Sequence, residues 1–315
     1  MRDHARFFIQ WQSFWGDTVK TPSRGASLML LLGLWLVWGY SWTASKLGLP
    51  YMSPLQLAFW RTLLGLVTLG CALLLTGRSV RPTPFWPTFW LGMGQTAGFG
   101  ALATMALLAG GAGKVSVLAY TMPFWTLLLA RVTLDERLSS MQWGAVLVAA
   151  VGLVLIIQPW HLHGSLLPDL LALASGLSWA LAAVQAKLLR KAHRVDTLAL
   201  TFWQMLWGLI PLGLLAWLIP APPVHVSWTL VGLLLYLGVL ASGLGWLLWM
   251  VLLSRLTAGM AGLNVLAIPA VAVLLAWLQM GEVPNPPEAS GMLMIGVALA
   301  LLSWLTAGRA TPSSR

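Results

Sequence analysis

Charged side chains are scarce in this 315-residue chain: Asp, Glu, Lys and Arg together make up only 8% of it. Hydrophobic residues make up 59%, whereas soluble proteins average about 45–50% apolar and about 25% charged residues. A soluble core of this length could not bury so many apolar side chains, so the composition excludes an ordinary soluble domain and indicates a lipid bilayer as solvent. The net charge is +10, and the basic residues that cause it lie in short gaps between apolar runs. This placement argues against a nucleic-acid partner.

Cysteine is nearly absent as well. Cys71 is the single cysteine and lies inside an apolar run, which excludes a disulfide framework and a cysteine-based metal site. The five histidines fall in loops or in the N-terminal arm, and the close pair His161 and His163 has no third ligand nearby. We therefore expect solvated loop histidines, no bound metal and no cofactor.

Carboxylates are missing from the centre of every apolar run, and Asp169 lies near the end of one. Proton-coupled carriers commonly use an intramembrane carboxylate or histidine as a relay, so this absence favours gradient-driven transport over proton antiport. No nucleophile–base constellation is visible, and the glycine-rich stretches lack the strand and lysine of a phosphate loop. The sequence gives no support for an enzyme.

Ten apolar segments remain, each close to the length of ~20 residues that spans a hydrocarbon core of ~30 Å. Proline-containing gaps such as 50–54 and 220–223 separate them. The sequence therefore predicts an all-α integral membrane protein with ten transmembrane helices, at residues 26–47, 54–76, 85–109, 114–132, 140–157, 166–189, 197–219, 227–254, 258–280 and 288–307.

One spacing occurs in both halves of the chain. Twelve residues separate Pro123 from Glu136, and the same number separates Pro269 from Glu282, at an offset of 146 residues. A second register, offset by 141 residues, pairs Trp38 with Trp179 and Lys46 with Lys187. These matches predict one fold unit used twice, which is typical of secondary transporters whose substrate site lies between the copies.

The basic residues predict the orientation. Fifteen of the eighteen lysine and arginine residues lie in gaps on one side of the predicted membrane, and only Lys114 lies on the other. Both termini are thus expected in the cytoplasm. Five spans per copy force the second copy to enter from the opposite side, which predicts inverted repeats. We expect a cytoplasmic arm at 1–25, a first repeat at 26–157, a second repeat at 166–307 and a cytoplasmic tail at 308–315.

The stretch Ala112–Ala145 resembles the EamA signature of the drug/metabolite transporter superfamily, and Leu256–Gly291 looks like a second copy of it. The first spans match the opening of that family through Trp38-Gly39, Lys46, Pro54 and Arg61. The resemblance implies a ten-helix carrier of the bacterial inner membrane, usually an exporter of small metabolites. Within the superfamily, the abundance of aromatic residues looks most like the YddG-type aromatic amino acid exporters.

Mid-span polar and aromatic side chains are the candidates for a substrate site. A buried indole N–H requires a partner that hydrocarbon does not supply, so tryptophans near span centres face either other helices or a wet cavity. Arg61 lies about two turns inside its span, where it either extends to the headgroups or binds an anion such as a substrate carboxylate. Helix-to-helix hydrogen bonds are the alternative for the amides. The predicted site comprises Trp38, Trp42, Arg61, Gln95, Tyr120, Trp125, Trp179, Gln185, Gln204 and Asn264.

Two further features of the spans have structural alternatives. Pro123 and Pro269 interrupt spans four and nine, as static kinks or as hinges for alternating access. Lys46 and Lys187 lie near opposite membrane faces, where we expect both to extend toward the headgroups.

The sequence predicts an exporter of small metabolites, foremost amino acids with aromatic or other neutral side chains, embedded in the lipid bilayer. An exporter of another metabolite or drug class, a channel and a non-transporting assembly protein remain alternatives. The oligomeric state is open, and a monomer is compatible with the sequence.

Overall fold

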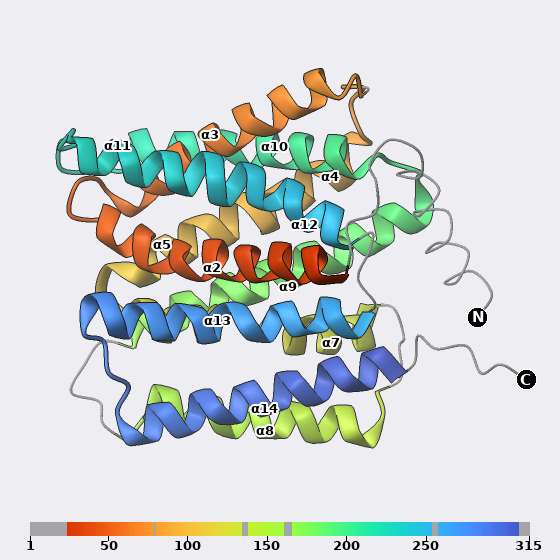
Figure 1. Cartoon of the computed structure of the whole chain (residues 1–315), viewed down its shortest axis with the longest axis vertical. Coiled ribbons are helices and arrows are strands. Elements are labelled where there is room, and N and C mark those ends of the chain that lie inside the picture. The colour runs from red at the N-terminus through yellow and green to blue at the C-terminus, as the bar shows by residue number, and fades with distance from the viewer. Residues whose placement is uncertain (1–23, 79, 134–137, 161–165, 254–257, 309–315) are drawn as a thin grey trace, which may run out of the picture.

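The computed structural model describes residues 24–78, 80–133, 138–160, 166–253 and 258–308. This part of the chain is helical and contains no strand. Long helices lie side by side in Figure 1, and short loops connect them at the two ends of the bundle. We name these ends after the residues that mark them. The Arg190 end, on the right in Figure 1, is where α9 ends and α10 begins, and the Glu282 end lies opposite.

The described residues of the first half form eight helical elements. They are α2 (Arg24–Gly48), α3 (Pro54–Leu75), α4 (Phe85–Gly92), the π-helix η1 (Met93–Gly98), α5 (Phe99–Ala109), α6 (Ala112–Ala119), α7 (Met122–Thr133) and α8 (Ser140–Ile157). The elements α4, η1 and α5 follow one another without a loop and form a single span.

The described residues of the second half form α9 (Leu167–Ala192), α10 (Thr197–Leu218), α11 (Trp228–Leu234), the π-helix η2 (Leu235–Leu244), α12 (Gly245–Leu253), α13 (Ala258–Met280) and α14 (Pro286–Gly308). The third span of this half, α11–η2–α12, again contains a π-helix. A π segment thus occupies the same place in the order of helices in both halves.

Eight of the described segments are long and apolar enough to cross a bilayer. The helices α2 and α13 are also long, and the apolar part of α13 covers Ala267–Met280. The architecture is therefore that of an all-helical membrane protein with eight to ten apolar helices. The tryptophans at the predicted span ends lie exposed on the outer surface, as expected for side chains at a membrane interface: Trp86, Trp90, Trp143, Trp160, Trp217, Trp228, Trp277 and Trp304.

Polar residues determine where several helices begin. Ser53 caps α3 and Ser139 caps α8, each by accepting a hydrogen bond from the backbone of a glutamine three residues later, whose side chain accepts from the capping residue in return. The carboxylate of Asp196 caps α10 by accepting from Ala199 N. These caps satisfy backbone donors that a membrane environment would otherwise leave without partners.

The predicted single span 114–132 is divided in the structure. α6 ends at Ala119 and α7 begins at Met122, so Pro123 lies in the first turn of a helix, where its missing N–H removes no helical hydrogen bond. Pro269 lies inside α13, and Pro211 lies inside α10. The two prolines of the repeated spacing therefore have different local environments.

The helices α8 and α14 pack closely through two glycines, and this contact gives a stability prediction. A Cβ atom on Gly291 would lie 2.5 Å from the carbonyl oxygen of Gly152, so Gly291→Ala is expected to lower the free energy of unfolding by about 1–3 kcal/mol through overpacking. Gly144 on α8 is the matched control, because no atom lies within 4 Å of its added Cβ. Thermal unfolding in detergent should separate the two alanine variants; equal midpoints would contradict the close packing.

Candidate functional site

A cavity of about 470 Å³ lies inside the helix bundle, within the size range of about 300–1,000 Å³ typical of small-molecule sites. Residues from both halves of the chain line it, on α2, α3, the η1–α5 span, α9, α10 and the η2–α12 span. It extends from Tyr120 and from Ser45, in the last turn of α2, to Arg190 and Thr197 at the Arg190 end. One chain therefore supplies a complete cavity.

Aromatic rings form a continuous wall on one side of this cavity. The rings of Trp179 and Trp246 are stacked, with centroids 5.9 Å apart and planes 15° apart. Phe99 and Trp179 form a T-shaped pair with ring centroids 4.8 Å apart, and the centroids of Trp38 and Trp246 are 5.8 Å apart. These rings come from α2, α5, α9 and α12, so the wall joins the two halves of the chain.

The wall continues toward the Glu282 end and toward the Arg190 end. The ring centroid of Trp42 lies 6.3 Å from that of Phe99 and 6.3 Å from that of Tyr120, and the centroids of Trp38 and Trp249 are 6.0 Å apart. All of these residues line the cavity. Such a surface offers a flat apolar or aromatic group several edge-on and stacking contacts.

A single basic side chain enters the inner part of the cavity. Arg61, half-buried on α3, donates from Nη1 to Ser45 Oγ at 3.1 Å. Ser45 in turn donates to the carbonyl oxygen of Ser41 at 2.6 Å, which fixes the hydroxyl as an acceptor for the guanidinium. No carboxylate of the described residues lies within ion-pair distance of Arg61. Its remaining N–H donors are available for an anion.

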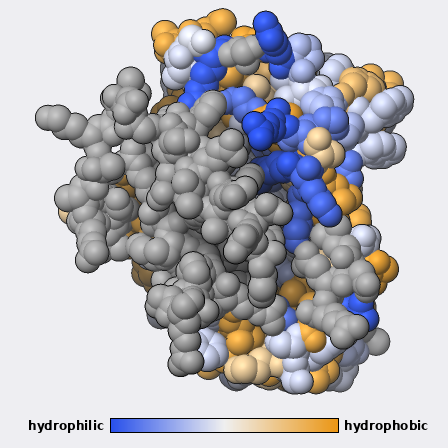
Figure 2. All heavy atoms as spheres, turned by 90° about the vertical axis from the view of Figure 1, so that its right-hand side faces the viewer, coloured by the Kyte–Doolittle hydropathy of each residue, from blue (hydrophilic) through white to orange (hydrophobic). Residues whose placement is uncertain are grey.

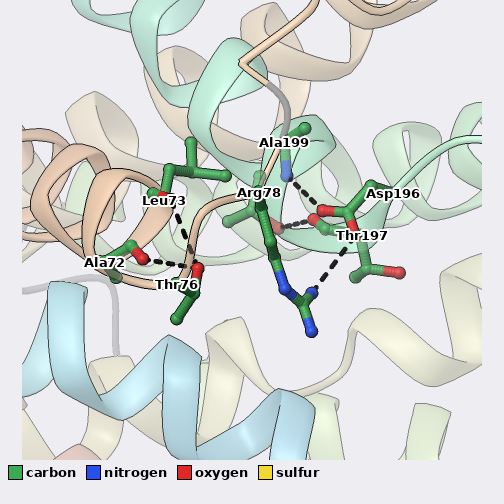
Figure 3. A network of polar contacts seen from close by, with 8 residues as sticks. Ala72, Leu73, Thr76, Arg78, Asp196, Thr197 and Ala199 are labelled. Carbon is green, nitrogen blue, oxygen red and sulfur yellow. Dashed lines mark hydrogen bonds and ion pairs between the residues drawn. The ribbon is translucent and has the colours of Figure 1, made fainter. Parts of the chain in front are cut away.

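The Arg190 end of the cavity contains polar side chains, and Figure 2 shows hydrophilic side chains gathered on this end of the molecule. Arg190 is exposed on the last turn of α9 and lines the cavity together with Thr197. Nearby, Arg78 pairs with Asp196 at 3.2 Å (Figure 3). The same carboxylate accepts from Ala199 N at 2.9 Å, so Asp196 is already occupied by two donors.

Two cross-connections hold the π-helices, which expose backbone groups that a regular helix would bond internally. Trp38 on α2 donates from Nε1 to Ala241 O of η2 at 3.0 Å. Ser178 on α9 donates from Oγ to Gly94 O of η1 at 2.8 Å. In each case the first long helix of one half contacts the π segment of the other half. The indole N–H of Trp38 is thus satisfied by backbone in the cavity wall.

Ion pairs hold the opposite, Glu282 end together. Lys46 at the end of α2 pairs with Glu282 at 2.9 Å and donates to Gly110 O at 2.7 Å. Glu282 also accepts from Gly113 N at 3.3 Å. The expected headgroup role of Lys46 is therefore replaced by a contact between the two halves of the chain.

A second ion-pair cluster lies at the same end. Lys114 on α6 contacts Asp169 at 3.0 Å and Glu288 at 3.3 Å, which joins the first turns of α9 and α14 to α6. A smaller pocket of about 250 Å³ lies between Lys114, Glu282 and Glu288. Leu107 and Leu118 belong to a buried apolar cluster, and Leu107 also lines the main cavity.

The structure brings seven of the ten predicted site residues together in the cavity wall: Trp38, Trp42, Arg61, Gln95, Tyr120, Trp179 and Gln204. Trp125 does not line it and instead donates to Thr121 Oγ1 at 3.1 Å. Gln185 is half-buried on α9 outside the wall, and the side chain of Asn264 lies outside the described residues. Glu136 lies outside them too.

Sequence reasoning missed further residues of the wall, among them Phe99, Arg190, Trp246 and Trp249. Trp246 and Trp249 lie three positions apart on α12, and Phe99 follows η1 directly. Their helical spacing is visible in the sequence, but any apolar helix contains such spacings. Arg190 belongs to the basic cluster that predicts the orientation of the chain in the membrane. Because this role explains the residue fully, the sequence does not indicate that it also lines the cavity.

A cavity with polar and aromatic walls, enclosed in a bundle of apolar helices, defines an integral membrane protein of the carrier type. Residues 25–158 and 166–304 each match the profile of the EamA-like transporter family. The chain belongs to this family, with two copies of the family unit. The protein is thus a transporter and not an enzyme.

Individual relatives agree with this assignment. The chain is 28% identical over 278 residues to a "Probable amino-acid metabolite efflux pump" of Salmonella typhimurium, which covers 84% of this chain and 90% of the relative. It is 26% identical to the "Uncharacterized transporter YoaV" of Bacillus subtilis, over 80% of this chain and 88% of that one. A solved structure described only as "Crystal structure of protein" has the same fold, with a TM-score of 0.64, 20% identity, and coverage of 90% of this chain and 99% of that one.

Proposed function

We propose that this protein exports small carboxylate-bearing metabolites, foremost amino acids with aromatic or other apolar side chains, across the bacterial inner membrane. One observation carries the proposal: the guanidinium of Arg61 faces a cavity of about 470 Å³ with aromatic walls and has no carboxylate partner among the described residues. A substrate carboxylate would supply the missing anion in bidentate geometry, and its apolar body would contact Trp179 and Phe99.

Alternating access between two inverted five-helix repeats is the transport mechanism that we propose. The duplicated family profile, the π segments at matching places and the reciprocal cross-connections of Trp38 and Ser178 all support it. We propose that the basic gaps lie in the cytoplasm, so that the Arg190 end faces inward and the cavity opens on that side, while the ion pairs at the Glu282 end close the other side. Bending at the π segments would exchange the two states, and Pro269 is a further flexible point in α13.

Amino acid export is supported by the relatives, since the Salmonella protein is named for efflux of amino-acid metabolites. The aromatic preference, as in YddG-type exporters, is supported by the cavity wall alone. A monomer suffices for this function because one chain encloses the cavity.

Efflux from loaded cells tests the proposal in the physiological direction. Cells that take up and hydrolyse phenylalanine-, leucine- or serine-containing dipeptides accumulate the free amino acids. Cells that also produce this protein are expected to release phenylalanine and leucine several-fold faster than control cells, because these side chains fit the apolar wall. Unchanged release of all amino acids would refute amino acid export and direct attention to another metabolite or drug class.

A further inference from the structure

The charges in the cavity restrict the substrate class further than the proposed function, on which this inference rests. Two charged residues line the cavity within the described part of the chain, and both are arginines: Arg61 in the interior and Arg190 at the end. No aspartate or glutamate is among the lining residues that the structure describes. A zwitterionic amino acid would thus find a cation for its carboxylate and no anion for its ammonium group.

The described carboxylates of the chain are already committed elsewhere. Asp169 and Glu288 bind Lys114, Glu282 binds Lys46, and Asp196 binds Arg78. These pairs occupy Lys46 and Lys114 at the Glu282 end and Arg78 at the Arg190 end. They leave Arg61 and Arg190 without a carboxylate partner among the residues that the structure describes. The positive potential of the cavity is therefore not cancelled within the described chain.

The polar lining offers neutral acceptors in place of a carboxylate. The Oε1 atom of Gln204, a buried side chain of the cavity wall, accepts no hydrogen bond from the described residues; the atom is itself covered, so a ligand N–H reaches it only when the amide rotates toward the cavity. A neutral acceptor suits the N–H of an amide, which is cheaper to remove from water than an ammonium group. The hydroxyls of Ser41 and Thr104 donate to backbone carbonyls, so they too face a ligand as acceptors.

We propose that the preferred substrates are net anionic: carboxylates with an apolar or aromatic body whose amino group is acylated or missing, such as N-acylated amino acids. Arg190 attracts the anion to the open end of the cavity, and Arg61 binds the carboxylate inside. Gln204 accepts from the amide N–H, and the aromatic wall contacts the apolar body. Cationic amines are excluded by the two guanidinium groups.

Three derivatives of phenylalanine, which share the side chain and differ in net charge, test the preference for anions. Liposomes that contain the purified protein are loaded with L-phenylalanine or N-acetyl-L-phenylalanine, and uptake of the same labelled compound by counterflow is measured. N-acetyl-L-phenylalanine, L-phenylalanine and L-phenylalaninamide are then added outside as competitors. We expect the N-acetyl anion to inhibit at a concentration at least about tenfold below that of the zwitterion, and the cationic amide to have no effect. Equal or better inhibition by the zwitterion would overturn the inference.

Substitutions of Arg190 test whether the preference for anions arises at the Arg190 end of the cavity. Arg190→Gln is expected to reduce the preference for the anion by about three- to tenfold, mainly through slower loading, and to weaken its dependence on salt. Arg190→Lys should keep the preference because it keeps the charge. Arg194→Gln is the matched control: it removes the same charge from the same end, and Arg194 does not line the cavity. Identical behaviour of the two glutamine variants would overturn the role of Arg190.

The outcomes separate this inference from the proposed function. If phenylalanine exchanges and the N-acetyl form is not preferred, the proposed export function stands and the inferred preference for anions is wrong. If the labelled carboxylates show no saturable exchange at all, both fail together.

Discussion

Replacing Arg61 by glutamine is expected to lower the initial rate of carboxylate counterflow at sub-saturating substrate by about a hundredfold or more. The substitution removes the charge and the paired donors that would hold the carboxylate, and hydrogen bonds to charged groups contribute about 1.5–3 kcal/mol each. Two such bonds correspond to roughly two to four orders of magnitude in affinity. Arg61→Lys keeps the charge but loses the planar pair of N–H donors that can bind both carboxylate oxygens. A smaller reduction of the counterflow rate, by about tenfold, is therefore expected.

Folding controls accompany this comparison. Arg61 also donates to Ser45, so thermal unfolding of each variant in detergent shows whether the loss of transport reflects loss of structure. Arg194→Gln provides a charge control outside the cavity wall. Wild-type transport by a folded Arg61→Gln variant would contradict the binding role of this residue.

Replacing Glu282 by glutamine is expected to open the Glu282 end. The change leaves Lys46 without its carboxylate and weakens the contact with the α6 backbone. Both side chains are about one quarter exposed, so we expect a cost of about 1–2 kcal/mol, which shifts the balance of inward- and outward-open states by about tenfold.

Cysteine labelling measures this opening. With Cys71 replaced by serine, a cysteine at the buried position Ser116 on α6 should react about tenfold faster with a membrane-impermeant thiol reagent, added at the Glu282 side, in the Glu282→Gln variant. Glu288→Gln is the matched control, because Lys114 keeps its contact with Asp169. Equal labelling of the two variants would contradict a closing role for the Lys46–Glu282 pair.

The sequence was sufficient to locate most of the helices and part of the cavity. Apolar run length and proline-rich gaps predicted the spans, because a bilayer imposes both on a helical chain. Trp38, Trp179 and Arg61 stood out as costly groups inside apolar runs, and all three line the cavity. Trp125 looked equivalent, but the neighbouring Thr121 hydroxyl accepts its N–H, so the side chain requires no cavity.

Other features depend on contacts that the sequence does not display. The ion pair between Lys46 and Glu282 joins residues 236 positions apart, and snorkelling gave an equally good local explanation for Lys46. The π segments η1 and η2 lie within longer apolar runs, so hydrophobic periodicity does not distinguish them from α-helix. The backbone of the structure places them, and Trp38 and Ser178 donate to one carbonyl oxygen in each.

Counterflow in proteoliposomes tests most directly the central claim that this cavity transports carboxylate-bearing metabolites. We predict saturable exchange of labelled N-acetyl-L-phenylalanine and, more weakly, of L-phenylalanine by the wild type, with strong loss in Trp38→Ala and Trp179→Ala and none in Gly144→Ala. Absence of saturable exchange for every carboxylate tested would contradict the transport function. Exchange that survives both tryptophan substitutions unchanged would contradict the location of the site.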